Sequence, residues 1–252
     1  MIYEGRNALV TGASRGIGRA VARALAREGA RVTVHYHEDR KAAEATLSSL
    51  EGNGHFVVQA DISDPDAAEE LVASSLRKAG GLDVVVNSAG IWEEHPPVDV
   101  DFSGWRASWR RILDLNLLGV ANLSYLAARA MMTGGGGRIV NISSRGAFRG
   151  EPEAPAYAAS KAGLNAMSQS LARALAPHNV FVTVVAPGFV ETDMAAEILA
   201  GPEGDSIRNQ SPLGRVATPE EVAETVLFLA SGRADFSTGC IVDVNGASYL
   251  RS

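Results

Sequence analysis

The sequence predicts a doubly wound α/β fold, with seven parallel strands in one sheet and helices on both faces. Short valine-rich segments alternate with amphipathic segments along most of the chain, as in repeated strand–helix–strand units. These strands are apolar on both sides, which is typical of parallel sheets covered by two helical layers. Because 252 residues with 46% hydrophobic composition suit one large α/β domain, we expect residues 1–252 to form a single domain.

The elements are predicted in strict alternation. Strands are expected at residues 6–11, 31–36, 55–60, 82–87, 138–142, 180–186 and 239–244. A first helix ends near residue 28, and others are expected at residues 39–50, 65–79, 103–132, 156–176 and 219–230. Residues 91–101 and 188–211 break this rhythm after the fourth and sixth strands. Ligands bind beyond the carboxyl ends of parallel strands, so we expect these two segments to form pocket walls or a lid.

Composition excludes several classes of protein. A formal net charge of −6, without any run of basic residues, is unlike a nucleic-acid-binding surface. Cys240 is the only cysteine, so the chain cannot form an internal disulfide. The first residues lack the apolar core of a secretion signal, and no apolar run approaches the roughly 18 residues of a membrane span. We therefore expect a cytoplasmic protein that binds neither nucleic acid nor membrane.

A glycine-rich turn, Thr11-Gly-Ala-Ser-Arg-Gly-Ile-Gly18, joins the first strand to the first helix. Its spacing is G-x-x-x-G-x-G rather than the commoner G-x-G-x-x-G. Missing side chains allow backbone N–H groups and the helix N-terminus to approach a pyrophosphate closely. A plain tight turn is the alternative interpretation. The predicted phosphate-binding residues are Gly12, Ser14, Arg15, Gly16, Ile17 and Gly18.

Tyr157 and Lys161 lie four residues apart in the helix predicted after the fifth strand. This spacing stacks the two side chains on one helix face, where an ammonium favours ionisation of a phenol whose ordinary pKa is about 10. Such a phenol can donate and accept protons. The hydroxyl of Ser144 can join it in polarising a carbonyl, with Ser143 as the neighbouring alternative. A surface aromatic–aliphatic pair is the other interpretation of the two helix residues.

Together these motifs resemble those of the short-chain dehydrogenase/reductase family over nearly the whole chain. Residues 11–18 match its T-G-x-x-x-G-x-G, and residues 157–161 match its Y-x-x-x-K. The segment Asn87-Ser-Ala-Gly90 matches its N-N-A-G with serine at the second position. Asn116 and the pair Pro187-Gly188 also fall where the family has them. The resemblance implies a Rossmann fold and an NAD(P)-dependent oxidoreductase that interconverts a carbonyl and a secondary alcohol.

The resemblance also implies roles for individual residues. Tyr157 would be the general acid/base, Ser144 would orient the substrate oxygen, and Lys161 would lower the pKa of Tyr157 and bind the nicotinamide ribose. Asn116 would hold a water that relays protons; a helix-interior amide is its alternative interpretation. The other implied cofactor contacts are Asp61, Ile62, Asn87, Ala89, Gly90, Pro187, Gly188, Val190 and Thr192.

The end of the second strand decides between NADP and NAD. An acid at this position binds the ribose 2′-hydroxyl of NAD, whereas a cation accepts the 2′-phosphate of NADP. The position and its surroundings hold Tyr36, His37, Arg15 and Arg40. This predicts NADP(H) as the cofactor. NAD is the alternative if Glu38 or Asp39 reaches the ribose, although Asp39 can instead cap a helix and Arg40 can be a surface charge.

For the substrate, the resemblance favours a 3-oxoacyl thioester, because many family members with a Pro-Glu-Glu helix and a Val-Asn-Gly ending are 3-oxoacyl-(acyl-carrier-protein) reductases. Against this, residues 132–138 and 176–179 offer an acidic carrier protein few basic groups, and residues 150–155 are acidic. A small ketone, a sugar or a steroid-like alcohol is the alternative. A non-catalytic NADP(H) sensor is the alternative of another class.

Two histidines on the second strand and one on a loop have structural interpretations. His35 and His37 face the same way, but no third ligand follows at a suitable spacing, so we expect no metal site. His95 either borders the substrate or lies on a solvated loop, and we favour the solvated loop.

Trp105 and Trp109, at positions i and i+4, predict a core or oligomer face on the long helix. The family resemblance implies a homotetramer assembled through the long helix, the tyrosine helix and the last strand. The interface candidates are Leu227, Phe228, Cys240, Val242 and Tyr249.

Overall fold

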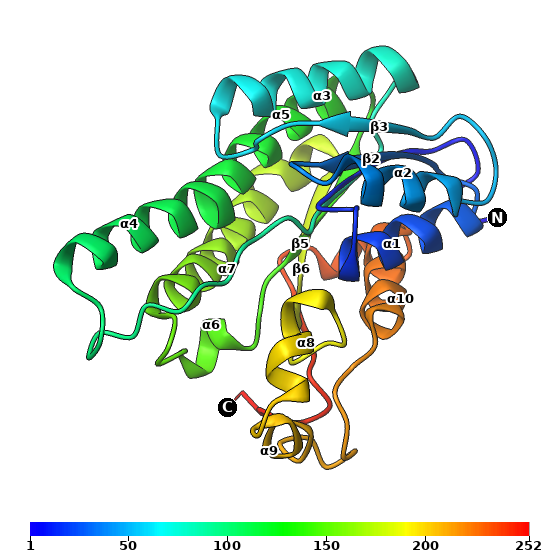
Figure 1. Cartoon of the computed structure of the whole chain (residues 1–252). Coiled ribbons are helices and arrows are strands. Elements are labelled where there is room, and N and C mark those ends of the chain that lie inside the picture. Colours follow the sequence, from blue (N-terminus) through cyan, green and yellow to red (C-terminus); the bar gives the residue numbers. More distant parts are fainter. Residues whose placement is uncertain (252) are drawn as a thin grey trace.

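The computed structural model describes residues 1–251 and contains one seven-stranded sheet (Figure 1). In chain order the strands are β1 (Asn7–Thr11), β2 (Arg31–Tyr36), β3 (Phe56–Gln59), β4 (Val84–Asn87), β5 (Gly137–Ile142), β6 (Val180–Pro187) and β7 (Ile241–Val244). Their spatial order is β3-β2-β1-β4-β5-β6-β7, and all neighbours are parallel. The predicted doubly wound parallel sheet is confirmed. Its strand order reverses between β1 and β4, where a ligand crevice is expected.

Ten α-helices surround the sheet within the described residues: α1 (Gly16–Arg27), α2 (Arg40–Ser48), α3 (Pro65–Ala79), α4 (Phe102–Leu113), α5 (Val120–Thr133), α6 (Gly146–Arg149), α7 (Pro155–Leu175), α8 (Asp193–Ala200), α9 (Gly204–Arg208) and α10 (Pro219–Ala230). Helices α1 and α10 pack together on one face, and α3, α5 and α7 cover the other (Figure 1). Within residues 1–251, no helix combines the length and the apolar character required to cross a bilayer.

Two apolar cores form because successive strand residues face opposite sides of the sheet. Val86 belongs to the core beneath α1 and α10, whereas its neighbour Val85 belongs to the core beneath α3 and α5. Burial of each such side chain stabilises the fold by about 1.5–3 kcal/mol. Leu227 on α10 also lies in the first core, so its assignment to an oligomer interface is wrong; the adjacent Phe228 is 56% exposed.

Capping residues explain why some helix bounds were predictable. At α3, the Asp64 side chain accepts a hydrogen bond from the Asp66 N–H, Pro65 occupies the first turn, and Gly80 ends the helix with φ of 82°. At α10, Thr218 and Glu221 form a reciprocal capping box. Both helices have the predicted bounds because these signals are local in sequence.

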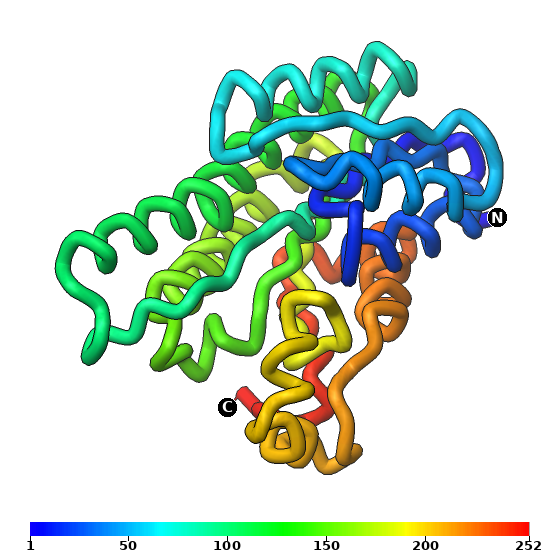
Figure 2. Tube along the Cα trace, viewed as in Figure 1, coloured from blue at the N-terminus to red at the C-terminus, as the bar shows by residue number. Residues whose placement is uncertain are grey.

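The structure differs most from the prediction in two places. The long helix predicted at residues 103–132 is divided by a π-helical segment, Asp114–Gly119, between α4 and α5. Residues 188–211 contain α8 and α9, which pack Ala195, Leu199 and Ile207 into a small separate core. These short helices lacked a sustained sequence pattern. Figure 2 shows the C-terminal segment beside them, where the Ser211 hydroxyl donates to the carbonyl of Gly246 at 2.6 Å.

Candidate active site

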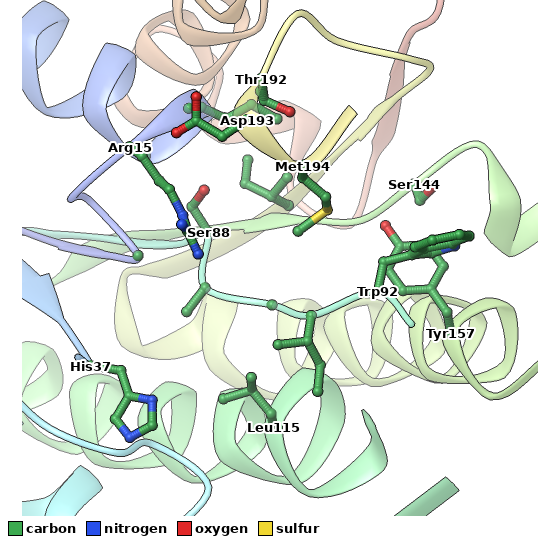
Figure 3. Close-up of a pocket in the computed structure, with 18 of the residues that line it drawn as sticks. Arg15, His37, Ser88, Trp92, Leu115, Ser144, Tyr157, Thr192, Asp193 and Met194 are labelled. Atoms are coloured by element: carbon green, nitrogen blue, oxygen red, sulfur yellow. The ribbon is translucent and has the colours of Figure 1, made fainter. Parts of the chain in front are cut away.

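A cleft of about 940 Å³ opens at the carboxyl ends of the strands. The β1–α1 turn, the ends of β2 and β3, the segments after β4, β5 and β6, and α7 all contribute to its wall. In Figure 3, Ser144, Tyr157 and Trp92 gather at one end, and Arg15 and His37 lie toward the other. The structure brings nearly all predicted site residues to this wall. The exceptions are Arg40, Asn87 and Asn116.

The glycine turn leaves space for a ligand at the start of α1. Gly12 and Gly16 have φ of +63° and +53°, values that side chains disfavour. A Cβ atom on Gly12 would lie 2.9 Å from the Cα atom of Ala89. The first N–H groups of the 12-residue helix α1 face this space, because the helix begins at Gly16. This arrangement fits the pyrophosphate of a dinucleotide.

We expect Gly12→Ala to weaken binding of a nicotinamide dinucleotide at least about 10-fold, since a methyl group would push the β4 segment away from the turn. The matched control is Gly80→Ala at the end of α3, where φ is +82° and the described residues leave open space for a Cβ atom. Both substitutions introduce backbone strain of about 1 kcal/mol, but the control should leave binding unchanged. Fluorescence titration with the reduced cofactor, together with thermal unfolding, measures the two effects. Equal binding by both variants would contradict the assignment.

Two buried side chains hold the turn in place. The Thr11 hydroxyl accepts hydrogen bonds from the N–H groups of Ser88 and Ala89, both at 3.0 Å. The Nδ1 atom of His35 accepts from the Gly12 N–H at 3.2 Å, and its Nε2 atom lies 3.1 Å from the Ala60 carbonyl. Burial lowers the pKa of His35 to about 4, so its imidazole is neutral near pH 7. Sequence reasoning did not assign either role.

Asn87 lies beneath the cleft rather than in its wall. Its Nδ2 atom donates to Asn141 Oδ1 at 2.8 Å and to the Ser124 hydroxyl at 3.2 Å. The Asn141 Nδ2 atom in turn donates to the Ser168 hydroxyl at 2.8 Å. Because these side chains come from β4, α5, β5 and α7, the network fixes the elements below the cleft relative to one another.

Asn116 also lies behind the wall, within the π-helical segment. Its side chain accepts from the Ile91 N–H and donates to the Ile91 carbonyl, both at 2.9 Å. A Cβ atom on Gly90 would lie 3.2 Å from Asn116 Oδ1 and 3.5 Å from Lys161 Nζ. Asn116 therefore anchors the segment that follows β4, and Gly90 leaves Lys161 accessible from the cleft.

The geometry distinguishes between the two serines at the end of β5. The side chain of Ser144 neighbours Tyr157 and, as a hydrogen-bonding group, lowers the pKa of its phenol; both residues line the cleft. The hydroxyl of Ser143 instead donates to the main-chain carbonyl of Lys161 at 3.4 Å. The Lys161 Nζ atom donates to the Ile142 carbonyl at 2.9 Å and lies 5.7 Å from the centre of the Tyr157 ring. Ser144, Tyr157 and Lys161 thus form one cluster in the wall.

Burial sets the acidity of this cluster. Burial raises the pKa of Tyr157, the Ser144 hydrogen bond opposes that rise, and the negative charge of Glu151 adds to it. Burial lowers the pKa of Lys161 to about 8. Burial therefore has the larger effect on the pKa of Tyr157, and the lowering of that pKa by Lys161 stays a prediction. A buried phenolate loses hydration, and the ammonium is directed at the Ile142 carbonyl.

Known proteins resemble this chain over its length. A family model described as enoyl-(acyl carrier protein) reductase matches residues 12–247. The 3-oxoacyl-(acyl-carrier-protein) reductase FabG of Staphylococcus aureus strain Mu50 is 37% identical over 97% of this chain and 98% of its own. FabG of Escherichia coli strain K12 is 39% identical over 99% and 100%. A Brucella melitensis structure titled short-chain dehydrogenase/reductase, glucose/ribitol dehydrogenase, is 35% identical with a TM-score of 0.90, covering 99% and 98%.

The chain belongs to the short-chain dehydrogenase/reductase family. It is therefore an oxidoreductase, of a family that uses nicotinamide cofactors. The predicted enzyme class is confirmed.

At the end of the cleft where this short-chain dehydrogenase/reductase has Arg15 and His37, the charges are mixed. His37 Nε2 lies 3.7 Å from an Asp61 carboxylate oxygen, and Arg15 is exposed. Asp39 caps α2 by accepting from the Ala42 N–H at 2.9 Å. Arg40 is an exposed surface charge that pairs with Glu44 at 2.8 Å. Arg15 is thus the cation that lines this end of the cleft.

The substrate end of the enzyme combines apolar and charged groups. Trp92, Phe189 and Met194 line it, and Met194 on α8 is 57% exposed. The half-buried carboxyl of Glu151 also lies in the wall, and burial raises its pKa. From the sequence, residues 188–211 were predicted only to form pocket walls or a lid. Which of their side chains line the cleft could not be predicted, because this depends on how α8 packs over the cleft.

Proposed function

We propose that the chain is an NADP(H)-dependent oxidoreductase that interconverts a carbonyl and a secondary alcohol, with Tyr157 as the acid/base. The gathering of Ser144, Tyr157 and Lys161 in one wall of the cleft is the observation that carries the proposal. It lies in the same cleft as a glycine turn that fits a pyrophosphate.

The bound nicotinamide supplies or accepts the hydride at the substrate carbon. In reduction, Tyr157 donates its proton to the substrate oxygen, and Ser144 donates a second hydrogen bond that stabilises the developing alkoxide. The raised pKa of Tyr157 keeps the phenol protonated near neutral pH, the form that reduction requires. Lys161, whose Nζ atom lies 5.7 Å from the centre of the Tyr157 ring, would bind the nicotinamide ribose and stabilise the phenolate left after proton transfer.

Turnover with a panel of carbonyl compounds tests this proposal. Oxidation of NADPH, followed by its absorbance, should require a carbonyl substrate. In Ser144→Ala, kcat should be lowered by about 10²-fold or more. Ser143→Ala is the matched control, because that hydroxyl bonds the main chain of Lys161. Tight NADPH binding without turnover on any substrate would favour the alternative of a non-catalytic sensor.

The preference for NADP(H) is assigned to Arg15. Because a charge-assisted contact contributes about 1.5–3 kcal/mol, Arg15→Ala should raise the Kd of NADPH by about 10-fold or more. The Kd of NADH should change by less than about 3-fold, since NADH lacks the 2′-phosphate. Arg77→Ala, which removes an exposed arginine paired with Glu70 on α3, is the control. Equal weakening of both cofactors by Arg15→Ala would contradict the assignment.

A 3-oxoacyl thioester is the substrate class that we propose first, because the relatives at 37–39% identity are named 3-oxoacyl-(acyl-carrier-protein) reductases. A small ketone, sugar or steroid-like alcohol is the second candidate, favoured by the acidic Glu151 in the wall. The ratio of kcat/KM on a carrier-protein thioester to that on the corresponding small thioester separates them. A large ratio indicates carrier docking, and inactivity on both thioesters excludes the first class.

We also propose a homotetramer in the cytoplasm. Exposed Phe228 on α10 and exposed Phe236 before β7 lie near the last strand, one of the regions expected to associate. Sedimentation of the purified chain should give four copies; a monomer at micromolar concentration would refute the assembly.

A further inference from the structure

Helix α7, which carries Tyr157 and Lys161, lacks the usual local cap at its N-terminus. The residue that precedes it is Ala154, whose methyl group accepts no hydrogen bond. Pro155 has no N–H, and the N–H groups of Tyr157 and Ala158 donate to the Ala154 carbonyl at 3.0 and 3.2 Å. The remaining donor of the first turn is the N–H of Ala156, a fully buried residue. A buried N–H without a local acceptor requires one from elsewhere in the fold.

His95 supplies that acceptor from the segment between β4 and α4. The Nε2 atom of its imidazole accepts a hydrogen bond from the Ala156 N–H at 3.0 Å. The main-chain N–H of His95 donates to the Glu153 carbonyl at 2.8 Å. The Nδ1 atom lies 3.0 Å from the Glu93 carbonyl, so Nδ1 carries the proton and Nε2 is free to accept. His95 is 1% exposed and meets the edge of Trp105 at 5.7 Å between ring centres. The expectation of a solvated loop is therefore wrong.

The segment that carries His95 is itself anchored at its other end. Asn116 holds the main chain of Ile91 through two hydrogen bonds, four residues before His95. This segment runs alongside the start of α7 (Figure 1). The capped residue, Ala156, directly precedes Tyr157. His95 thereby connects the first turn of α7 to the segment between β4 and α4, which Asn116 anchors at Ile91.

We propose that His95 is a positioning residue: its neutral imidazole caps α7 from a distant segment and holds the phenol of Tyr157 against Ser144. The inference rests on the proposed acid/base function of Tyr157. Small displacements of a reacting group lower the rate steeply, whereas binding of a cofactor at the opposite end of the cleft depends on other residues. The expected signature is therefore a lower kcat at nearly constant affinity.

Two amide substitutions distinguish the ring nitrogens. In His95→Gln, the amide oxygen stands as many bonds from Cα as Nε2 does and can accept from Ala156; in His95→Asn, it stands where Nδ1 does and cannot reach. We expect kcat of the Gln variant within about 3-fold of wild type, and that of the Asn and Leu variants lower by tens-fold. The KM and the Kd of NADPH should change by less than about 3-fold in all three. Full activity of the Asn variant, or a Gln variant as inactive as the Leu variant, would overturn the inference.

Two measurements do not depend on activity. Amide hydrogen exchange in residues 155–158 should accelerate in the Asn and Leu variants but not in the Gln variant. In the wild type, the imidazole nitrogen spectrum of His95 should show the tautomer protonated at Nδ1; a proton on Nε2 at neutral pH would refute the cap even if every variant failed to fold. If Tyr157→Phe retained activity, the proposed function would fail while these two results could still hold, so the two failures are distinguishable.

Discussion

Replacing Tyr157 with phenylalanine is expected to lower kcat for carbonyl reduction by about 10³-fold, within the range for loss of a general acid. The ring and its packing remain, so the Kd of NADPH should stay within about 3-fold of wild type. The physical reason is that the raised pKa of Tyr157 keeps its phenol protonated beside Ser144 in the cleft, so that this phenol can serve as the proton donor. Steady-state kinetics on the best substrate of the panel, with fluorescence titration of NADPH, measures both quantities.

Tyr125→Phe is the matched control, since it removes the hydroxyl of an exposed tyrosine on α5. It should keep the activity of wild type. A Tyr157→Phe enzyme that retained more than about a tenth of the wild-type kcat would rule out Tyr157 as the required acid.

The second large effect is expected for Lys161→Met, which should abolish most activity yet stabilise the fold at neutral pH. Burial lowers the pKa of Lys161 from 10.5 to about 8. The unfolded chain binds the Lys161 proton more tightly than the folded protein does, so the free energy of unfolding rises with pH between those two values. Below about pH 8 the full cost of burying the charged lysine reduces the stability of the fold. The difference between the pKa values of Lys161 in the unfolded and folded states corresponds to a free energy of about 3 kcal/mol. Loss of the hydrogen bond to the Ile142 carbonyl offsets part of the gain, so we expect about 1–2 kcal/mol.

Chemical unfolding at several pH values measures this gain. The free-energy difference between Lys161→Met and wild type should be largest at about pH 7 and should shrink as the pH rises toward the ordinary lysine pKa. Lys41→Met, at an exposed position on α2, is the control and should show no such dependence. A difference that stays constant with pH would mean that Lys161 is not penalised by burial.

The fold and the cluster could be predicted because their signals are local. Strand and helix alternation, the caps around Pro65 and Pro219, and the four-residue spacing of Tyr157 and Lys161 each depend on residues close in sequence. The choice between Ser143 and Ser144 could not be made in this way. It depends on how the end of β5 faces α7, since neighbouring strand residues point in opposite directions.

Other features depend on contacts between distant segments. The direction of the pKa shift of Tyr157 follows from the desolvation of its hydroxyl, which no spacing reveals. His95 and Ala156 are 61 residues apart, and only the folded chain shows that one caps the other. The π-helical segment around Asn116 follows a helical pattern in sequence, so its altered winding was not foreseen. Tertiary contacts thus determine the parts of the site that local patterns leave open.

Transfer of label from deuterated NADPH tests the central claim most directly. With the transferable hydrogen of the nicotinamide replaced by deuterium, the enzyme and a carbonyl substrate should yield an alcohol whose carbinol carbon carries one deuterium. Tyr157→Phe should form that product only at its residual rate while still binding NADPH. Mass spectrometry of the product decides the outcome. An alcohol formed without deuterium, or labelled product formed equally fast without the Tyr157 hydroxyl, would contradict the account.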